Sequence, residues 1–221
     1  MNEVMELFNT GSPETVSSSV RLLLLLTVLS LAPSILILMT CFTRIVIVLS
    51  FVRTALATQQ MPPNQVLIGL SLFLTFFIMA PTLQQVNDEA LTPLFNEDIS
   101  LEEAYEKAAV PFKDFMSKHT RQKDLELFLA YSKAEKPDSI QDIPLTSLVP
   151  AFAISEIKTA FQIGFMVFIP FLVIDMVVAS VLMSMGMMML PPVMISLPFK
   201  ILLFVLVDGW YLVIKSLLQS F

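Results

Sequence analysis

The chain has 221 residues, of which 56% are hydrophobic and only 14% are charged, and its formal net charge is −6. Soluble domains carry about 25% charged residues, so this composition indicates a membrane protein, and the acidic balance argues against a nucleic-acid-binding surface. The five dispersed glycines form no phosphate-binding loop, and the single Cys41 and single His119 give no zinc-ligand spacing, so we expect neither a cofactor nor a metal site.

A polar tail, residues 1–20, precedes two apolar segments in residues 21–86. The tail contains three acids and no Lys or Arg, so it lacks the basic start of a signal peptide. The first apolar segment, residues 21–51, contains Pro33, which predicts a kink. The second, residues 65–86, has no ionisable side chain. We expect these two segments to form a first helical hairpin.

A polar insert, residues 87–150, follows. It holds thirteen acidic and seven basic residues, a net of −6, which equals the charge of the whole chain. The motif Ser100-Leu-Glu-Glu103 predicts a capping box at a helix start, and Pro111 predicts a second helix start. Apolar residues then recur at three- and four-residue spacing, which indicates amphipathic helices. Because so few helices cannot form their own core, we expect Phe115 and Phe128 to pack between neighbouring copies of the chain.

Residues 151–221 predict a second helical hairpin. Its arms, residues 151–185 and 193–215, are each long enough to cross a hydrocarbon core of ~30 Å. Pro170 predicts a kink in the first arm. We therefore expect an all-α, membrane-associated protein of four apolar helical segments with a mostly helical polar insert.

The turn between these arms is rich in methionine and carries no charge. It reads Met183-Ser-Met-Gly-Met-Met-Met-Leu-Pro-Pro192. Loops in water are normally polar, and unbranched thioethers adapt to varied surfaces. Met187, Met188 and Met189 therefore predict a deformable seal, and a methionine-filled packing core is the alternative interpretation.

Six charged residues lie within or beside the apolar segments. A charge at the centre of a membrane helix costs roughly 2.5–3.5 kcal/mol, so each should face protein or water. Three are basic and three acidic, which favours pairing within and between subunits that fixes the assembly; a proton relay is the alternative. The two members Lys200 and Asp208 lie about two helical turns apart. The full set is Arg44, Glu156, Lys158, Asp175, Lys200 and Asp208.

The residues suggest three alternative functions. An intramembrane aspartyl protease would use Asp175 and Asp208 as a dyad sharing one proton, but no Gly-x-Gly-Asp motif surrounds either residue. A Cu(I) transporter would use the clustered thioethers, although no Cys or His accompanies them. A small-ion channel is the third alternative. We expect the chain not to be an enzyme.

Several motifs together resemble the FliP family of flagellar and type III secretion export proteins. The resemblance covers residues 20–221. The motifs are Leu31-Ala-Pro-Ser-Ile-Leu-Ile-Leu-Met-Thr-Cys-Phe-Thr-Arg-Ile45, Pro62-Pro-Asn-Gln-Val66, Phe161-Gln-Ile-Gly-Phe165, Ile169-Pro-Phe-Leu-Val-Ile-Asp175, Met183 to Pro192, Leu197-Pro-Phe-Lys200 and Asp208-Gly-Trp210.

This resemblance implies a core subunit of the export gate in the bacterial cell membrane, at the flagellar basal body. In that family several copies assemble with FliQ and FliR into a helical, funnel-like complex, which works with FlhA and FlhB to export unfolded flagellar proteins. The resemblance also implies that Met187, Met188 and Met189 form a gasket that narrows the channel. Assembled gates of this kind sit raised out of the bilayer, so their apolar helices need not span it conventionally.

Overall fold

A computed structural model describes residues 33–58, 60–132, 137, 139–187 and 189–221, together with the isolated positions 23, 26, 27 and 30. Every regular element in these residues is a helix, which confirms the all-α prediction. Residues 38–221 form one compact unit, and the fold and sites below belong to it.

The first apolar segment is broken beyond Pro33. The kink predicted at Pro33 stays a prediction, because residues 31 and 32 lie outside the described residues. A helix over Pro33–Met39 ends at Thr40, and helix α3 begins afresh at Phe42 and runs to Ala55. The hydroxyl of Thr40 accepts a hydrogen bond from the backbone N–H of Phe42 at 3.3 Å. Such local hydrogen bonds compete with the backbone hydrogen bonds of a helix, which accounts for this break about two turns beyond Pro33.

The second segment extends further than predicted. Helix α4 spans Asn64–Val86 and continues through a π-helical turn, Asn87–Leu91, into helix α5, Thr92–Phe95. The N–H of Thr92 donates to the carbonyl of Asn87, the five-residue step of a π turn. Polar side chains alone do not end a helix, so the predicted insert boundary at residue 87 falls inside a continuous helical rod.

The insert contains helices α6, Leu101–His119, and α7, Gln122–Ser132, and a short 3₁₀ helix, Ile140–Asp142. The predicted capping box is confirmed: the Glu103 N–H donates to Ser100 Oγ at 3.2 Å, and the Ser100 N–H donates to Glu103 Oε2 at 3.0 Å. The predicted helix start at Pro111 is wrong. Pro111 lies inside α6 and is buried, so packing of its ring offsets the backbone hydrogen bond that proline cannot make.

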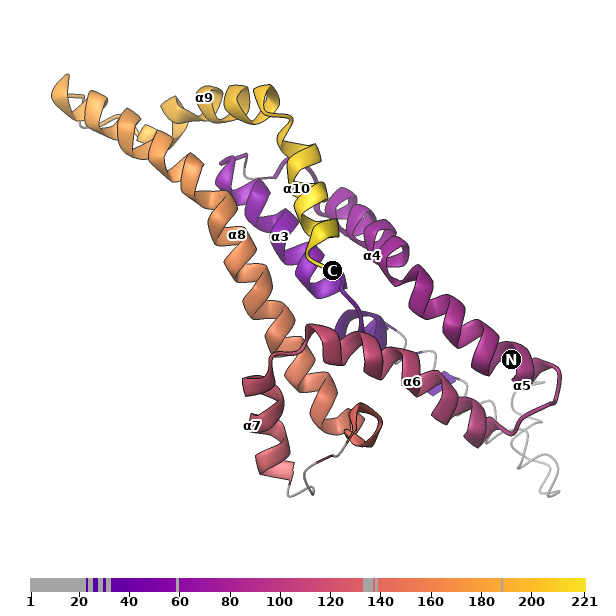
Figure 1. Ribbon diagram of the computed structural model, residues 1–221. Coiled ribbons are helices and arrows are strands. Elements are labelled where there is room, and N and C mark those ends of the chain that lie inside the picture. Colours follow the sequence, from indigo (N-terminus) through magenta and orange to yellow (C-terminus); the bar gives the residue numbers. More distant parts are fainter. Residues whose placement is uncertain are drawn as a thin grey trace, which may run out of the picture. The chain divides into compact units, whose positions relative to one another are not determined.

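The second hairpin consists of helices α8, Leu145–Ser184, and α9, Pro192–Leu206, followed by α10, Gly209–Gln219. Helix α8 begins six residues before the predicted boundary at 151 and includes Pro150 and Pro170 without interruption. The predicted single fourth segment is split at Asp208, where α9 and α10 meet at 63°. Figure 1 shows α10 turning away from α9 at this point.

Among the described residues, two elements are long and apolar enough to cross a membrane: Asn64–Phe95 and Leu145–Ser184. The interrupted pairs formed by Pro33–Met39 with α3, and by α9 with α10, would raise the number to four, which agrees with the four apolar segments predicted from the sequence.

Helix α3 forms the centre of the main core. Its buried side chains Ile45, Val48, Leu49 and Val52 pack with residues of α4 and α8. A second cluster fastens the insert to the start of α8, and it comprises Met116, Ile143, Leu148 and Phe152. The insert therefore does not depend entirely on neighbouring copies for a core, because α8 of the same chain provides part of it.

Close packing of α3 on α8 depends on Gly164. A Cβ atom at this position would lie 2.5 Å from Cγ of Phe51 on α3, whereas a Cβ at Gly69 of α4 would meet nothing within 4 Å. We predict that Gly164→Ala lowers the free energy of unfolding by about 1–3 kcal/mol, the usual effect of overpacking. Thermal unfolding in detergent micelles measures this change.

Gly69→Ala is the matched control, and it should be neutral or stabilising by about 0.5–1 kcal/mol because alanine favours a helix interior. Equal destabilisation by both substitutions would contradict the packing of α3 against α8.

Candidate functional site

The methionine-rich turn has a defined backbone. Gly186 has φ +73°, the left-handed conformation that glycine adopts without a Cβ penalty. Its N–H donates to the carbonyl of Met183 at 3.0 Å, and the N–H of Met187 donates to the carbonyl of Leu182, also at 3.0 Å. This pair of bonds is the Schellman motif. Helix α8 therefore ends at a fixed point, and the methionine side chains extend beyond a well-formed helix terminus.

The thioethers of this turn are exposed on the single chain. Met187 is 43% exposed and Met189 is 98% exposed, whereas Met188 lies outside the described residues. Exposed methionines continue into both helices at Met183 and Met194. A methionine-filled core within one chain does not fit these exposures, because Met189 is almost uncovered and Met183, Met187 and Met194 are covered only in part.

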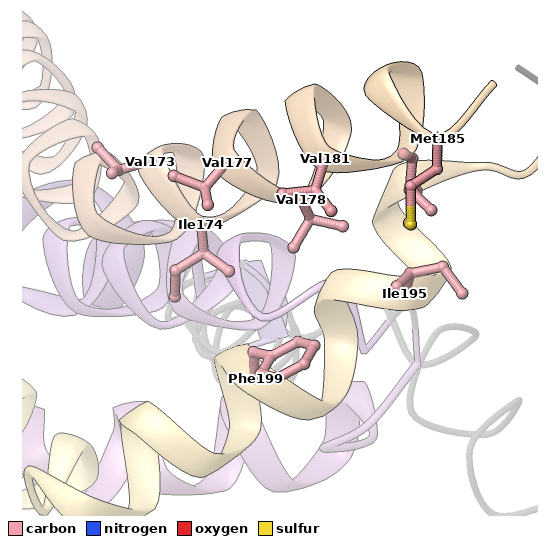
Figure 2. A pocket seen from close by; sticks show the side chains of 9 residues that line it. Val173, Ile174, Val177, Val178, Val181, Met185, Ile195 and Phe199 are labelled. Carbon is pink, nitrogen blue, oxygen red and sulfur yellow. The ribbon is translucent and has the colours of Figure 1, made fainter. Parts of the chain in front are cut away.

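Below the turn, α8 and α9 enclose an apolar groove of about 510 Å³. Figure 2 shows side chains of both helices lining it. The lining residues are Val173, Ile174, Val177, Val178, Val181, Leu182, Met185, Ile195 and Phe199. No charged side chain lines this groove, so between α8 and α9 the hairpin presents an apolar surface.

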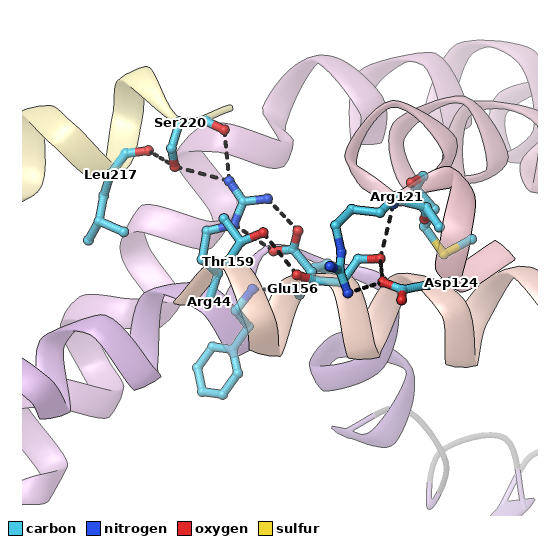
Figure 3. A network of polar contacts seen from close by, with 12 residues as sticks. Arg44, Arg121, Asp124, Glu156, Thr159, Leu217 and Ser220 are labelled. Atoms are coloured by element: carbon cyan, nitrogen blue, oxygen red, sulfur yellow. Dashed lines mark hydrogen bonds and ion pairs between the residues drawn. The ribbon is translucent and has the colours of Figure 1, made fainter. Parts of the chain in front are cut away.

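Two of the predicted embedded charges form a buried ion pair. Arg44 of α3 and Glu156 of α8 are 3% and 0% exposed, and the guanidinium binds the carboxylate through two nitrogens, with Nε to Oε2 at 2.9 Å. Arg44 Nη1 also donates to the carbonyl of Ser220 at 2.7 Å, and its Cζ lies 3.8 Å from the ring centroid of Phe221. Figure 3 shows this network. We call it the Arg44 clamp, because it joins α3, α8 and the last residues of the chain.

Asp175 and Lys200 form a second pair within the hairpin. Lys200 Nζ lies 2.6 Å from Asp175 Oδ2, and the hydroxyl of Ser196 donates to the other carboxylate oxygen. The lysine is 2% exposed and the aspartate 26%. Each charge thus has an opposite charge or a hydrogen-bond donor, which lowers the cost of placing both in an apolar segment.

The remaining two predicted charges, Lys158 and Asp208, are exposed and belong to none of the ion pairs among the described residues. Asp208 therefore does not pair with Lys200, although the two lie about two turns apart in sequence. The chain bends between them: Asp208 has φ 52°, and a Cβ at Gly209 would lie 2.3 Å from Cδ2 of Phe204. Because of this bend, Lys200 and Asp208 do not lie on one face of a continuous helix, which their pairing would require.

Sequence reasoning missed a third ion pair. Arg121 Nη2 lies 2.6 Å from Asp124 Oδ2, and the hydroxyl of Ser155 on α8 donates to the same oxygen at 2.6 Å. Burial raises the pKa of Asp124, but the hydrogen bonds from Ser155 and Arg121 and the charge of Arg121 outweigh burial, so this pKa lies below its ordinary value. The three-residue spacing of Arg121 and Asp124 at the start of a helix was the available signal.

Phe115 packs within its own chain. Its ring lies 6.0 Å from that of Phe152 and 6.4 Å from that of Phe221, and it also contacts His119. Burial lowers the pKa of His119 to about 4, and the nearby charges of Arg44 and Lys118 act in the same direction, so this imidazole is neutral at pH 7. Phe128 on α7 is half-buried. Phe115 is half-buried as well, so both side chains retain some surface for a neighbouring copy, and their packing between copies stays a prediction.

The Arg44 clamp generates a stability prediction. Removing one member of a buried pair leaves the other charge without a partner, which costs about 3–5 kcal/mol. We expect Arg44→Gln to lower the free energy of unfolding by this amount in detergent, as measured by chemical denaturation.

Arg53→Gln is the control on the same helix. Arg53 donates only to the carbonyl of Pro62 and the side chain of Asn64, so its loss should cost about 1 kcal/mol. If Arg44→Gln lowered the free energy of unfolding no more than Arg53→Gln does, the Arg44 clamp would not stabilise the fold.

Comparison with known proteins agrees with this architecture. A family model described as the FliP family matches residues 25–217. Flagellar biosynthetic protein FliP of Bacillus subtilis (strain 168) is 78% identical over 221 residues, which is 100% of both chains. The proteins of that name from Aquifex aeolicus (strain VF5) and Pectobacterium carotovorum subsp. carotovorum are each 57% identical, over 92% of this chain and 86% and 79% of their own. The chain belongs to the FliP family of flagellar biosynthetic proteins.

Proposed function

We propose that the chain is a core subunit of the flagellar export gate in the bacterial cell membrane, at the basal body. Several copies assemble with FliQ and FliR around a channel, work with FlhA and FlhB, and pass unfolded flagellar proteins. The observation that carries this proposal is 78% identity to a flagellar biosynthetic protein over the complete length of both chains. The two long apolar helices, and the two bent helix pairs that could each form one further span, support a membrane location.

The methionine turn is the proposed gate. Met187, Met188 and Met189 of several copies converge to narrow the channel, and the exposed side chains of Met187 and Met189 support this role. An unbranched thioether changes conformation at little cost and packs against varied surfaces. A ring of such side chains closes on itself when empty and moves aside for an extended polypeptide. The Schellman end of α8 provides a fixed base for these mobile side chains.

The embedded charges are the proposed assembly determinants. The pairs Arg44 with Glu156 and Asp175 with Lys200 hold each copy in one shape, while the exposed Lys158 and Asp208 are available to neighbouring subunits. Buried charge pairs favour one register over others because a mismatched arrangement leaves a charge unpaired.

The alternatives are weaker on specific grounds. An aspartyl protease needs two carboxylates sharing a proton, whereas Asp175 is bound to Lys200 and Ser196. A Cu(I) site would rest on thioether sulfurs alone, since no group of three His, Cys, Asp or Glu side chains gathers in the described part of the chain. A small-ion channel would need polar groups along its path, and the groove between α8 and α9 has no charged lining.

A substitution series at the turn tests the gate. Replacing Met187, Met188 and Met189 together by Leu keeps apolar side chains of similar volume, so we expect intact closure. Replacing all three by Ala removes most of the side-chain volume that closes the channel, so we expect ions or small solutes to leak through it. The measurements are membrane leak in cells that express the complex and swimming motility as a readout of export.

The ranking of the two variants separates the hypotheses. A Cu(I) function predicts that Leu is as damaging as Ala, because both remove every sulfur ligand. Tight membranes with the Ala variant, at normal levels of assembled complex, would contradict the proposed seal.

A further inference from the structure

Two exposed apolar patches lie on the polar insert, outside the long apolar helices. The first consists of Phe95 at the end of α5 and of Leu101 and Tyr105 on α6, which are 80%, 76% and 66% exposed. Leu101 and Tyr105 are four residues apart and so share one helix face. The second consists of Leu127 and Tyr131 on α7, also four residues apart, of which Tyr131 is 83% exposed. Exposed apolar side chains that lie together on a polar domain indicate a surface that contacts another molecule.

The surroundings of the two patches have opposite charge. Residues 87–106, which include the first patch, contain seven acids and no basic residue. We call this region the acidic end, and its carboxylates are Asp88, Glu89, Glu97, Asp98, Glu102, Glu103 and Glu106. None of them belongs to an ion pair among the residues that the structure describes.

The second patch is bordered by exposed lysines. Lys123 lies in the first turn of α7, four residues before Leu127, and Lys158 on α8 is near enough to lower the pKa of Asp124 on α7. We call Leu127, Tyr131 and these two lysines the α7 face. Its one exposed acid on α7 is Glu126, so the lysines outnumber it.

The two surfaces of one copy cannot meet. They lie at opposite ends of α6 (Figure 1), whose 19 residues span about 28 Å at 1.5 Å per residue. Among the described residues, neither surface can therefore serve as the complement of the other within one chain. In an identical copy each surface finds a complement, with apolar side chains against apolar side chains and carboxylates against lysines. Contacts between two different surfaces of identical chains are head-to-tail contacts, which build rings or helices rather than closed pairs.

We propose that the acidic end of one copy docks on the α7 face of the next. Phe95, Leu101 and Tyr105 pack against Leu127 and Tyr131, and the surrounding carboxylates and lysines set the register. This inference rests on the proposed function in one respect, namely that several copies assemble. It goes further by naming the two surfaces that form the contact between them. The occupant is a second copy rather than lipid, because seven carboxylates disfavour contact with anionic headgroups.

Cysteine cross-linking in the full chain tests the contact. The single Cys41 is replaced by Ala, and Tyr105→Cys and Tyr131→Cys are made in separate chains with different affinity tags, coexpressed with FliQ and FliR. We expect oxidation to yield dimers carrying both tags when the two chains are mixed and no dimers when either is expressed alone. Phe73→Cys, at an equally exposed aromatic of α4, replaces Tyr105→Cys in the control and should give no dimer with Tyr131→Cys.

Charge reversal provides the second test. Glu102→Lys or Lys123→Glu should each lower the yield of mixed dimers about two- to five-fold at low salt, in the range of exposed ion pairs, and the two together should restore it. Dimers from a single variant would show a two-fold symmetric contact and overturn the proposal.

Native mass spectrometry determines whether the complex has its full mass. A complex of full mass that yields no mixed dimers would overturn the head-to-tail contact, but it would not contradict the export-gate function. If the unsubstituted chain itself failed to assemble with FliQ and FliR, the proposed function and this inference would both be contradicted.

Discussion

A buried bidentate ion pair holds together parts of the chain that are far apart in sequence. Arg44 and Glu156 are separated by 112 positions, and Arg44 also binds Ser220, from which it is separated by 176 positions. Bringing two charges out of water is costly, so such a pair is stable only when every donor and acceptor is satisfied. The carboxylate, the Ser220 carbonyl and hydroxyl, and the ring of Phe221 together meet that requirement.

The geometry of the rest of the chain follows from this constraint. The last residues can reach Arg44 only if the chain turns back after α9, and the 63° bend at Asp208 provides that turn. Helix α3 must lie close to α8, and Gly164 allows it. The hairpin of α8 and α9 then extends beyond the packed region. Its methionine turn is thereby exposed for contacts with other copies, while its base is fixed.

The sequence predicted the helical class, the apolar segments and the capping box, because composition, hydrophobic runs and local motifs act over a few residues. It predicted the turn between α8 and α9 but not the breaks within the first and fourth apolar segments. Pro111, Pro150 and Pro170 lie inside helices, whereas the breaks occur at Thr40 and Asp208, where local hydrogen bonding and the close approach of Phe204 to Gly209 decide.

The sequence also did not predict which charged side chains form ion pairs with one another. The nearest acid along the chain suggested Asp208 for Lys200, but the hairpin brings Asp175 to it across 25 positions. The role of Phe115 depended in the same way on tertiary contacts, with Phe152 and Phe221. Long-range pairing follows from helix packing, which no local pattern specifies.

The central claim is that methionine turns of several copies meet at one point. A spin label at Met189→Cys, in a Cys41→Ala background, measures this in the assembled complex by electron paramagnetic resonance. Met189 is 98% exposed in the single chain, so the label should not disturb the fold. The account predicts strong dipolar broadening between labels on different copies, which disappears when labelled chains are diluted with unlabelled ones. Spectra without broadening, from labels accessible to lipid-dissolved oxygen, would contradict it.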